Sequence, residues 1–267
     1  MLALPGYLLA DLTERALPSG VSDRLAVAVA RLVFVARPPA RKALEGNLHR
    51  LMPEAPAGVR RAMARQAFEQ FALSLLDFLR LGRLDAPALA AAVEVRGAEH
   101  LERARTSGRG VILLSAHLGN WEWGAAWLAT RGTRLSVIAR PHPHPWVERF
   151  FAGRREAHGV AVLRGRPLWP GAAGALRRRE WVAVMGDRCC ADGSAWAWVA
   201  ALARRTGALV LPAVMVRLPA GRFAACFDPP LSPDACAAGE HRAAIEAQLE
   251  RHPGQWSGFE PLPGDAA

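Results

Sequence analysis

The alternation of short apolar runs with amphipathic stretches is the feature that most constrains the fold of this chain. After Pro87, runs rich in valine, isoleucine and leucine are separated by segments whose apolar residues repeat at helical spacing. Such alternation is typical of an α/β domain with a mostly parallel central sheet flanked by helices. Pro212 lies within one expected strand, so it predicts a bulge or an edge position there. Strands are expected at residues 110–115, 135–139, 160–163, 181–185, 209–216 and 222–227, and helices at 121–130, 146–157, 168–178, 198–206 and 240–252.

The first ninety or so residues differ, because helical periodicity dominates there. Residues 25–36 and 60–81 each place their apolar side chains on one helical face. A chain of 267 residues fits one large domain, or a core with a smaller appendage. We therefore expect an N-terminal helical region over 1–92, facing a membrane or packed on the core, and an α/β core over 93–262. The two regions are expected to form a single integrated domain.

The longest apolar run, residues 25–36, contains Arg31 and is too short to span a bilayer, since a spanning helix needs roughly 20 apolar residues. It predicts a helix that lies along a membrane surface or docks in the core. The first twenty residues have an acidic residue early and no basic start, so no signal peptide is expected.

The chain is strongly basic, with a formal net charge of +10, and Lys42 is its only lysine. A surface rich in arginine favours anionic partners such as phospholipid headgroups or an acidic carrier protein. The arginines are scattered and match no known nucleic-acid-binding module, so no nucleic acid partner is expected.

The segment "SAHLGNWEWG", residues 115–124, carries the clearest functional signal. It follows an expected strand, and sites in open α/β sheets form at the carboxyl ends of strands. Asn120 predicts the N-cap of the next helix, and Glu122 would sit in its first turn, where a carboxylate suits the helix dipole. The structural alternative is that Glu122 serves only the helix and that His117 is a loop histidine bonded to backbone.

The chemical alternative pairs His117 with Glu122. If the loop folds back, the carboxylate accepts the proton of one ring nitrogen and leaves the other as a general base for a hydroxyl or a water. Gly119 would permit the tight approach that such a loop needs.

Competing chemistries lack their signatures. The sequence has no G-x-S-x-G elbow, no P-loop and no G-x-G-x-x-G after a strand. His142 and His144 have no carboxylate or cysteine nearby at ligand spacing, so no metal site is expected.

The segment "GRGVILLSAHLGNWEWG", residues 108–124, resembles the central motif of the late acyltransferases of lipid A biosynthesis. These belong to the lysophospholipid acyltransferase superfamily, whose defining element pairs a histidine with an acidic residue shortly after it, matched here by His117 and Glu122. Further segments that resemble the family in order are residues 41–53, 93–104, 139–160, 203–212 and 251–261.

The resemblance implies an α/β fold with extra helices and the transfer of a fatty acyl group from a carrier thioester to a hydroxyl of a glycolipid. On the family pattern His117 would be the general base and Glu122 would orient it. Arg140 would hold a phosphate of the substrate or the carrier, a role that suits a guanidinium. Asp187 would position Arg140 or the acceptor sugar. The transfer needs no cofactor, no metal and no covalent enzyme intermediate.

Arg188 stands where the family has a glutamine, and with Arg140, Asp187 and Asn120 it completes the predicted substrate-binding set. The donor would be an acyl carrier protein or coenzyme A thioester, and the acceptor a glycolipid such as a lipid A precursor. The alternatives are a lysophospholipid or phosphatidylinositol-mannoside acyltransferase, and a non-catalytic lipid-binding homologue. The expected location is the cytoplasmic face of the inner membrane, peripheral or monotopic, on an anionic lipid surface.

Overall fold

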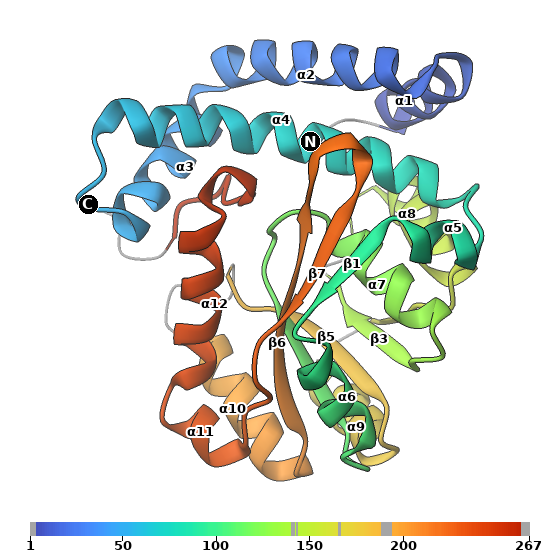
Figure 1. Cartoon of the computed structure of the whole chain (residues 1–267), viewed down its shortest axis with the longest axis vertical. Helices are drawn as coiled ribbons and strands as arrows, with labels where there is room; N and C mark the ends of the chain where they lie inside the picture. Colours follow the sequence, from blue (N-terminus) through green and yellow to red (C-terminus); the bar gives the residue numbers. More distant parts are fainter. Residues whose placement is uncertain (1–3, 140–141, 143, 165–166, 188–193, 263–267) are drawn as a thin grey trace.

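A computed structural model of the chain describes residues 4–139, 142, 144–164, 167–187 and 194–262 (Figure 1). Within them a single seven-stranded sheet forms the centre of the molecule, with helices around it. The strands are β1 (Val93–Arg96), β2 (Val111–Ser115), β3 (Leu135–Ile138), β4 (Ala161–Leu163), β5 (Trp181–Met185), β6 (Leu209–Arg217) and β7 (Phe223–Phe227).

Helices account for most of the remaining described residues. Those before the sheet are α1 (Leu4–Ala16), α2 (Ser19–Ala36), α3 (Pro38–Leu51), α4 (Ala57–Leu81) and α5 (Ala86–Ala91). Those after β1 are α6 (Ala98–Thr106), α7 (Trp121–Thr130), α8 (Pro145–Ala157), α9 (Leu168–Arg177), α10 (Ser194–Thr206), α11 (Pro233–Ala237) and α12 (Glu240–Arg251), with short 3₁₀ turns η1 (Pro219–Gly221) and η2 (Pro253–Gln255).

The strand order is β1-β7-β6-β2-β5-β3-β4, and every neighbouring pair is parallel except β6 with β7. The mostly parallel α/β fold expected from the alternating pattern is therefore confirmed, and each expected strand lies within two residues of an observed one. The edge strand β1 was not expected. Its four residues, half of them exposed, lack the long apolar run that marks the central strands.

Pro212 lies in β6, which is an interior strand, so the expected edge position is wrong. The register shows why a proline is tolerated there. β6 pairs with β2 up to Pro212, opposite Leu114, and its antiparallel pairing with β7 begins at Ala213. Proline cannot donate a ladder hydrogen bond, and it falls where β6 changes its main pairing partner.

Helix α4 crosses the carboxyl end of the sheet, and α1 and α2 lie on its far side (Figure 1). Its apolar face packs inward, since Phe68, Phe78 and Leu79 are buried. Helix α2 instead buries Ala30 and Phe34 and leaves the apolar face expected from its periodicity exposed, so docking of that face in the core is wrong. No helix in the described part of the chain is long and apolar enough to cross a bilayer.

Asn47 on α3 fastens the C-terminal segment to the helical layer. Its side chain is fully buried, and its Nδ2 donates to the carbonyl oxygens of Gly258 (2.9 Å) and Glu260 (2.8 Å). Its Oδ1 accepts from the backbone N–H of Leu262 at 3.0 Å. One side-chain amide thus satisfies three backbone groups of the segment 258–262, which forms neither a helix nor a strand.

We expect Asn47→Ala to lower the free energy of unfolding by about 2–3 kcal/mol, because it leaves the buried carbonyl of Gly258 and two partly buried backbone groups without their partner. Urea denaturation followed by tryptophan fluorescence measures the change. His49→Ala is the matched control, since His49 is an exposed residue of the same helix, and it should change the free energy by less than about 0.5 kcal/mol. Equal effects of the two substitutions would show that the amide does not hold the segment.

Candidate active site

The site forms where two adjacent parallel strands end. β2 ends at Ser115 and β5 ends at Met185, and these two residues are partners in the register. His117 and Asp187 each lie two residues beyond their strand, so the sheet brings them together. The Nδ1 of His117 lies 2.9 Å from Oδ1 of Asp187.

The carboxylate of Asp187 is fully buried and has three hydrogen-bond donors around it. Its Oδ1 faces both the ring Nδ1 and the backbone N–H of His117, the latter at 3.0 Å, and its Oδ2 accepts from Nε1 of Trp256 at 2.8 Å. Burial alone would raise the pKa of Asp187, but the charge and hydrogen bonds of His117, with the bond from Trp256, lower it below its ordinary value.

An ionised carboxylate can only accept hydrogen bonds, so the proton on the His117 ring must sit on Nδ1. Nε2 then carries the lone pair, and it has no hydrogen-bond partner among the described residues. The side chain of His117 is 20% exposed, and the ring of Trp121 meets it edge-on with centroids 5.1 Å apart. The arrangement therefore presents a partly open imidazole base at the carboxyl edge of the sheet.

The loop that carries His117 is held in place by its backbone. Gly119 has a φ of +63°, and a Cβ there would clash with the carbonyl oxygen of Met215, so this position requires glycine. The close approach is to β6, not the expected approach of the imidazole to Glu122. The N–H of Asn120 donates to the carbonyl of Met215 at 2.8 Å, and the N–H of Ser257 donates to the carbonyl of His117 at 2.8 Å. From the helical layer, the hydroxyl of Ser74 on α4 donates to the Gly119 carbonyl at 3.0 Å.

Trp256 follows η2 and packs against both the Asp187 carboxylate and the loop that carries His117. Its side chain is 2% exposed, and its backbone forms a β-bridge with Leu118. The preceding residue, Gln255, exchanges two hydrogen bonds with the backbone of Arg217, at 2.8 and 2.9 Å. The segment 255–257 thus fixes both the His117 loop and the Asp187 carboxylate.

Glu122 does not contact His117, so the expected dyad between them is wrong. Helix α7 begins at Trp121, and from its first turn the Glu122 carboxylate faces α8, where it forms a two-pronged ion pair with Arg155. The Nε of Arg155 donates to Oε2 at 2.9 Å. Burial opposes the charge of Arg155, but Glu122 more than compensates and raises the pKa of the guanidinium.

Asn120 is the N-cap of α7, as its sequence position predicts, because its Oδ1 accepts from the N–H of Trp123 at 3.0 Å. Its Nδ2 donates to Asp77 on α4 at 3.3 Å, and the side chain is 1% exposed. Both ends of the amide are therefore engaged inside the protein, which argues against the predicted substrate contact. Burial raises the pKa of Asp77 to about 6, against the opposing charges of Arg217 and Arg80.

Asp187 was expected to position Arg140 or a sugar, but both of its oxygens are taken by His117 and Trp256. Arg140 and Arg188 lie outside the described residues, so their predicted roles stay predictions. Among the described residues no group of His, Cys, Asp and Glu side chains is arranged to hold a metal ion. His142 Nδ1 accepts from the N–H of His144 instead, at 3.0 Å.

Sequence reasoning did not identify two residues that shape the site, Trp256 and Arg155. Trp256 lies in the segment 251–261, whose resemblance to the family was clear, but nothing local indicated that its indole would reach a carboxylate. Arg155 lies in an arginine-rich helix, where its pattern does not distinguish it from exposed neighbours.

Comparison with known proteins identifies the family. The family profile of the bacterial lipid A biosynthesis acyltransferases matches residues 12–262. The phosphatidylinositol mannoside acyltransferase of Mycolicibacterium smegmatis is 28% identical over 158 residues, which are 59% of this chain and 51% of that protein. The protein of the same name from Mycobacterium tuberculosis is 29% identical over 162 residues, 58% of this chain and 51% of that protein. The aligned region spans about half the length of these curated relatives.

Among solved structures, the chain is similar to the 1-acyl-sn-glycerophosphate acyltransferase PlsC of Thermotoga maritima. The TM-score is 0.44 and the sequence identity 14%, and the match covers 88% of this chain and 99% of that one.

We expect Trp256→Phe to lower the free energy of unfolding by about 2 kcal/mol at neutral pH, because the buried Asp187 anion loses one donor. The pKa of Asp187 is depressed in the folded protein, so its stabilisation is present above the unfolded value of about 4 and is lost as pH falls through the folded value.

The stability difference between Trp256→Phe and the parent chain should therefore shrink as pH falls below about 4. It should vanish only when the carboxyl is protonated in both folded proteins, which in the parent requires a pH below the lowered pKa of Asp187. Urea titrations across pH measure it, and Trp146→Phe, at an exposed tryptophan, is the matched control. A difference that stays constant with pH would contradict an ionised Asp187 as the group that Trp256 serves.

Proposed function

Because this chain belongs to the bacterial lipid A biosynthesis acyltransferase family, we propose that it transfers a fatty acyl group from a carrier thioester to a hydroxyl of a membrane glycolipid, with His117 as the general base. The observation that carries the proposal is the buried, ionised Asp187, which fixes the His117 proton on Nδ1 and leaves Nε2 as a base. The family supplies the reaction class, and the geometry supplies the group that can begin it.

In the proposed reaction Nε2 of His117 removes the proton of the acceptor hydroxyl as its oxygen attacks the thioester carbon. The new C–O bond gives a tetrahedral intermediate, which collapses when the C–S bond breaks. The thiolate of the carrier leaves and takes the proton from His117, so the base is restored and an ester has replaced the thioester. Asp187 stays ionised and stabilises the imidazolium between the two proton transfers.

Asp187 is a positioning residue in this proposal, because it acts through His117. Glu122, bound to Arg155, is proposed to fix the start of α7 against α8, and so the wall of the site beside Trp121. The acidic residue of the family motif would then support the site rather than polarise the base.

The proposed acceptor is a glycolipid hydroxyl. The family description points to a lipid A precursor, whereas the names of the similar mycobacterial proteins point to a mannosylated inositol lipid as a second candidate. Both are sugar-bearing lipids of a membrane surface. The donor is proposed to be an acyl carrier protein or coenzyme A thioester, and the setting the cytoplasmic face of the inner membrane.

We expect His117→Ala to lower acyl transfer by about 10³-fold or more, since a positioned base contributes about 10²–10⁴-fold. Asp187→Asn should cause a loss of similar order, because an amide no longer selects the correct tautomer. Glu122→Gln should cost far less, because Glu122 does not touch the base. His100→Ala, a histidine on α6 at the other end of the sheet, is the matched control.

The assay uses the purified full chain with an acyl thioester, a lipid A precursor, a phosphatidylinositol mannoside and a lysophospholipid, with products identified by mass spectrometry. A product with one added acyl chain on either glycolipid supports the proposal and selects the acceptor. Transfer only to the lysophospholipid would overturn the glycolipid assignment, and a loss at Glu122→Gln equal to that at Asp187→Asn would overturn the division of roles.

A further inference from the structure

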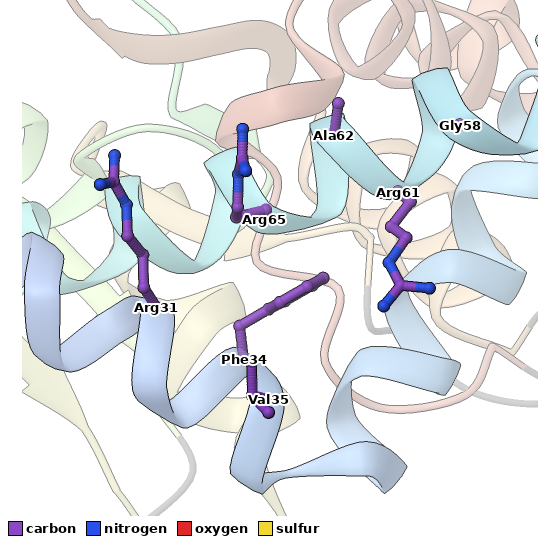
Figure 2. Close-up of a pocket in the computed structure, with 7 residues that line it drawn as sticks. All are labelled: Arg31, Phe34, Val35, Gly58, Arg61, Ala62 and Arg65. Atoms are coloured by element: carbon purple, nitrogen blue, oxygen red, sulfur yellow. The ribbon is translucent and has the colours of Figure 1, made fainter.

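A groove lies between α2 and α4, on the far side of α4 from the His117 site. It is open to solvent and has a volume of about 450 Å³, enough for a small-molecule headgroup. Figure 2 shows Arg31, Phe34 and Val35 lining it from α2, and Arg61 and Arg65 lining it from α4, with the three guanidinium groups spread along its length.

The charge of the groove is positive and only partly compensated. Glu69 binds Arg31 at 2.8 Å and lies 3.9 Å from Arg65. Arg61 has no acidic partner among the described residues. Three arginines against one carboxylate leave an excess of two positive charges, on side chains that are 61% exposed for Arg31 and 59% for Arg65. Guanidinium groups in such numbers suit a phosphate, whose oxygens accept paired hydrogen bonds.

The groove opens beside an apolar surface. Phe34 is buried at its floor, whereas Val35 is 67% exposed. Leu25, Val29 and Leu32 on the same helix are 47%, 49% and 70% exposed, and on α1 Leu9 and Leu12 are 65% and 64% exposed. Exposed apolar residues on one face of a helix, as on α2, mark a binding surface for a protein or a membrane. A ligand that fits both features has an anionic head and apolar chains.

We propose that the groove between α2 and α4 binds the phosphate headgroup of an anionic phospholipid, while the exposed apolar face of α2 inserts among the acyl chains. Charge complementarity favours an anionic occupant. The neighbouring apolar residues favour a bilayer over an acidic soluble protein, because a bilayer can bury them among its acyl chains. Arginine suits this depth, since its stem packs on apolar groups while its head stays at the phosphate level.

Helix α4 connects the groove to the His117 loop, because it carries both the groove arginines and the serine that bonds the loop. Arg65 and Ser74 lie on this helix, roughly 14 Å apart along its axis, and the Ser74 hydroxyl donates to the Gly119 carbonyl. A lipid held by Arg61 and Arg65 would therefore fix the orientation of the site relative to the bilayer. Binding at the groove needs no chemistry at His117, so a test that measures binding is independent of the proposed reaction.

The test measures sedimentation of the full-length protein with vesicles of phosphatidylcholine alone and with added phosphatidylglycerol. We expect the Arg61→Gln/Arg65→Gln variant to weaken binding to the anionic vesicles by about tenfold or more. The matched control is Arg103→Gln/Arg177→Gln, which removes the same charge from exposed positions on α6 and α9 at the opposite end of the molecule (Figure 1). It should change binding by less than about twofold, because salt screens the attraction between these distant positions and the lipid surface.

The second variant, Leu32→Gln/Val35→Gln, keeps the charge and removes the apolar contact, and it should also weaken binding to both kinds of vesicle. His117→Ala should bind like the parent chain, which separates failure of the chemistry from failure of the groove. Circular dichroism confirms that each variant is folded.

Three results would overturn the proposal. Equal losses from the two arginine pairs would mean diffuse charge attraction. Unchanged vesicle binding in Arg61→Gln/Arg65→Gln, with lost binding of an acidic acyl carrier protein, would make the groove a protein-docking site. Binding of inorganic phosphate that depends on Arg61 and Arg65, while vesicle binding ignores them, would make it a site for free anions.

Discussion

The hydrogen bond between the buried carboxylate of Asp187 and the ring of His117 is the interaction on which the site depends. A carboxylate with no exposed surface is stable as an anion only if donors surround it, and here the donors come from two parts of the chain that the fold must bring to Asp187. The β2–β5 register supplies His117, and the segment after η2 supplies Trp256. The same carboxylate therefore ties the C-terminal segment to the sheet and fixes the proton on the imidazole.

The periodicity of the sequence was enough to predict the α/β fold and the approximate bounds of six of the seven described strands and of most helices after β2, because apolar runs of the central strands are long and unbroken. It did not predict the bounds of α1, α3, α5, α6, α11 or the edge strand β1. It was not enough to predict the partner of His117. Glu122 is close in sequence, whereas Asp187 becomes close only because β5 lies next to β2, and strand order is a property of the whole sheet. The clue was present in the sequence, since His117 and Asp187 each follow an expected strand by two residues. The edge position predicted from Pro212 was wrong for a related reason. Whether a strand accepts a proline at that point depends on which strands pair with β6 on either side of it.

The motif residues that did not reach the base have other uses. Asn120 caps α7 and donates a hydrogen bond to Asp77 on α4, and Glu122 joins α7 to α8 through its ion pair with Arg155. The loop of five residues, 116–120, that carries His117 between β2 and α7 has little room to move once the N-cap and the first turn of that helix are held in place. The acidic position of the motif can thus influence the proposed chemistry through the rigidity of the loop, without touching the imidazole.

Helix α4 links the two surfaces that the proposals concern. One side of it packs on the sheet and bonds the His117 loop through Ser74, and the other side forms the arginine-lined groove with α2. An enzyme whose acceptor and product are both lipids must hold its base at a fixed height above the bilayer, because the reacting hydroxyl cannot travel far from the headgroup region. A stiff 25-residue helix between the proposed base and the proposed membrane contact would meet that need. A flexible linker in the same place would leave the height of the base above the bilayer undefined. The exposed apolar face of α2 and the buried face of α4 would therefore act together, the first by contacting the bilayer and the second by fixing the base relative to it.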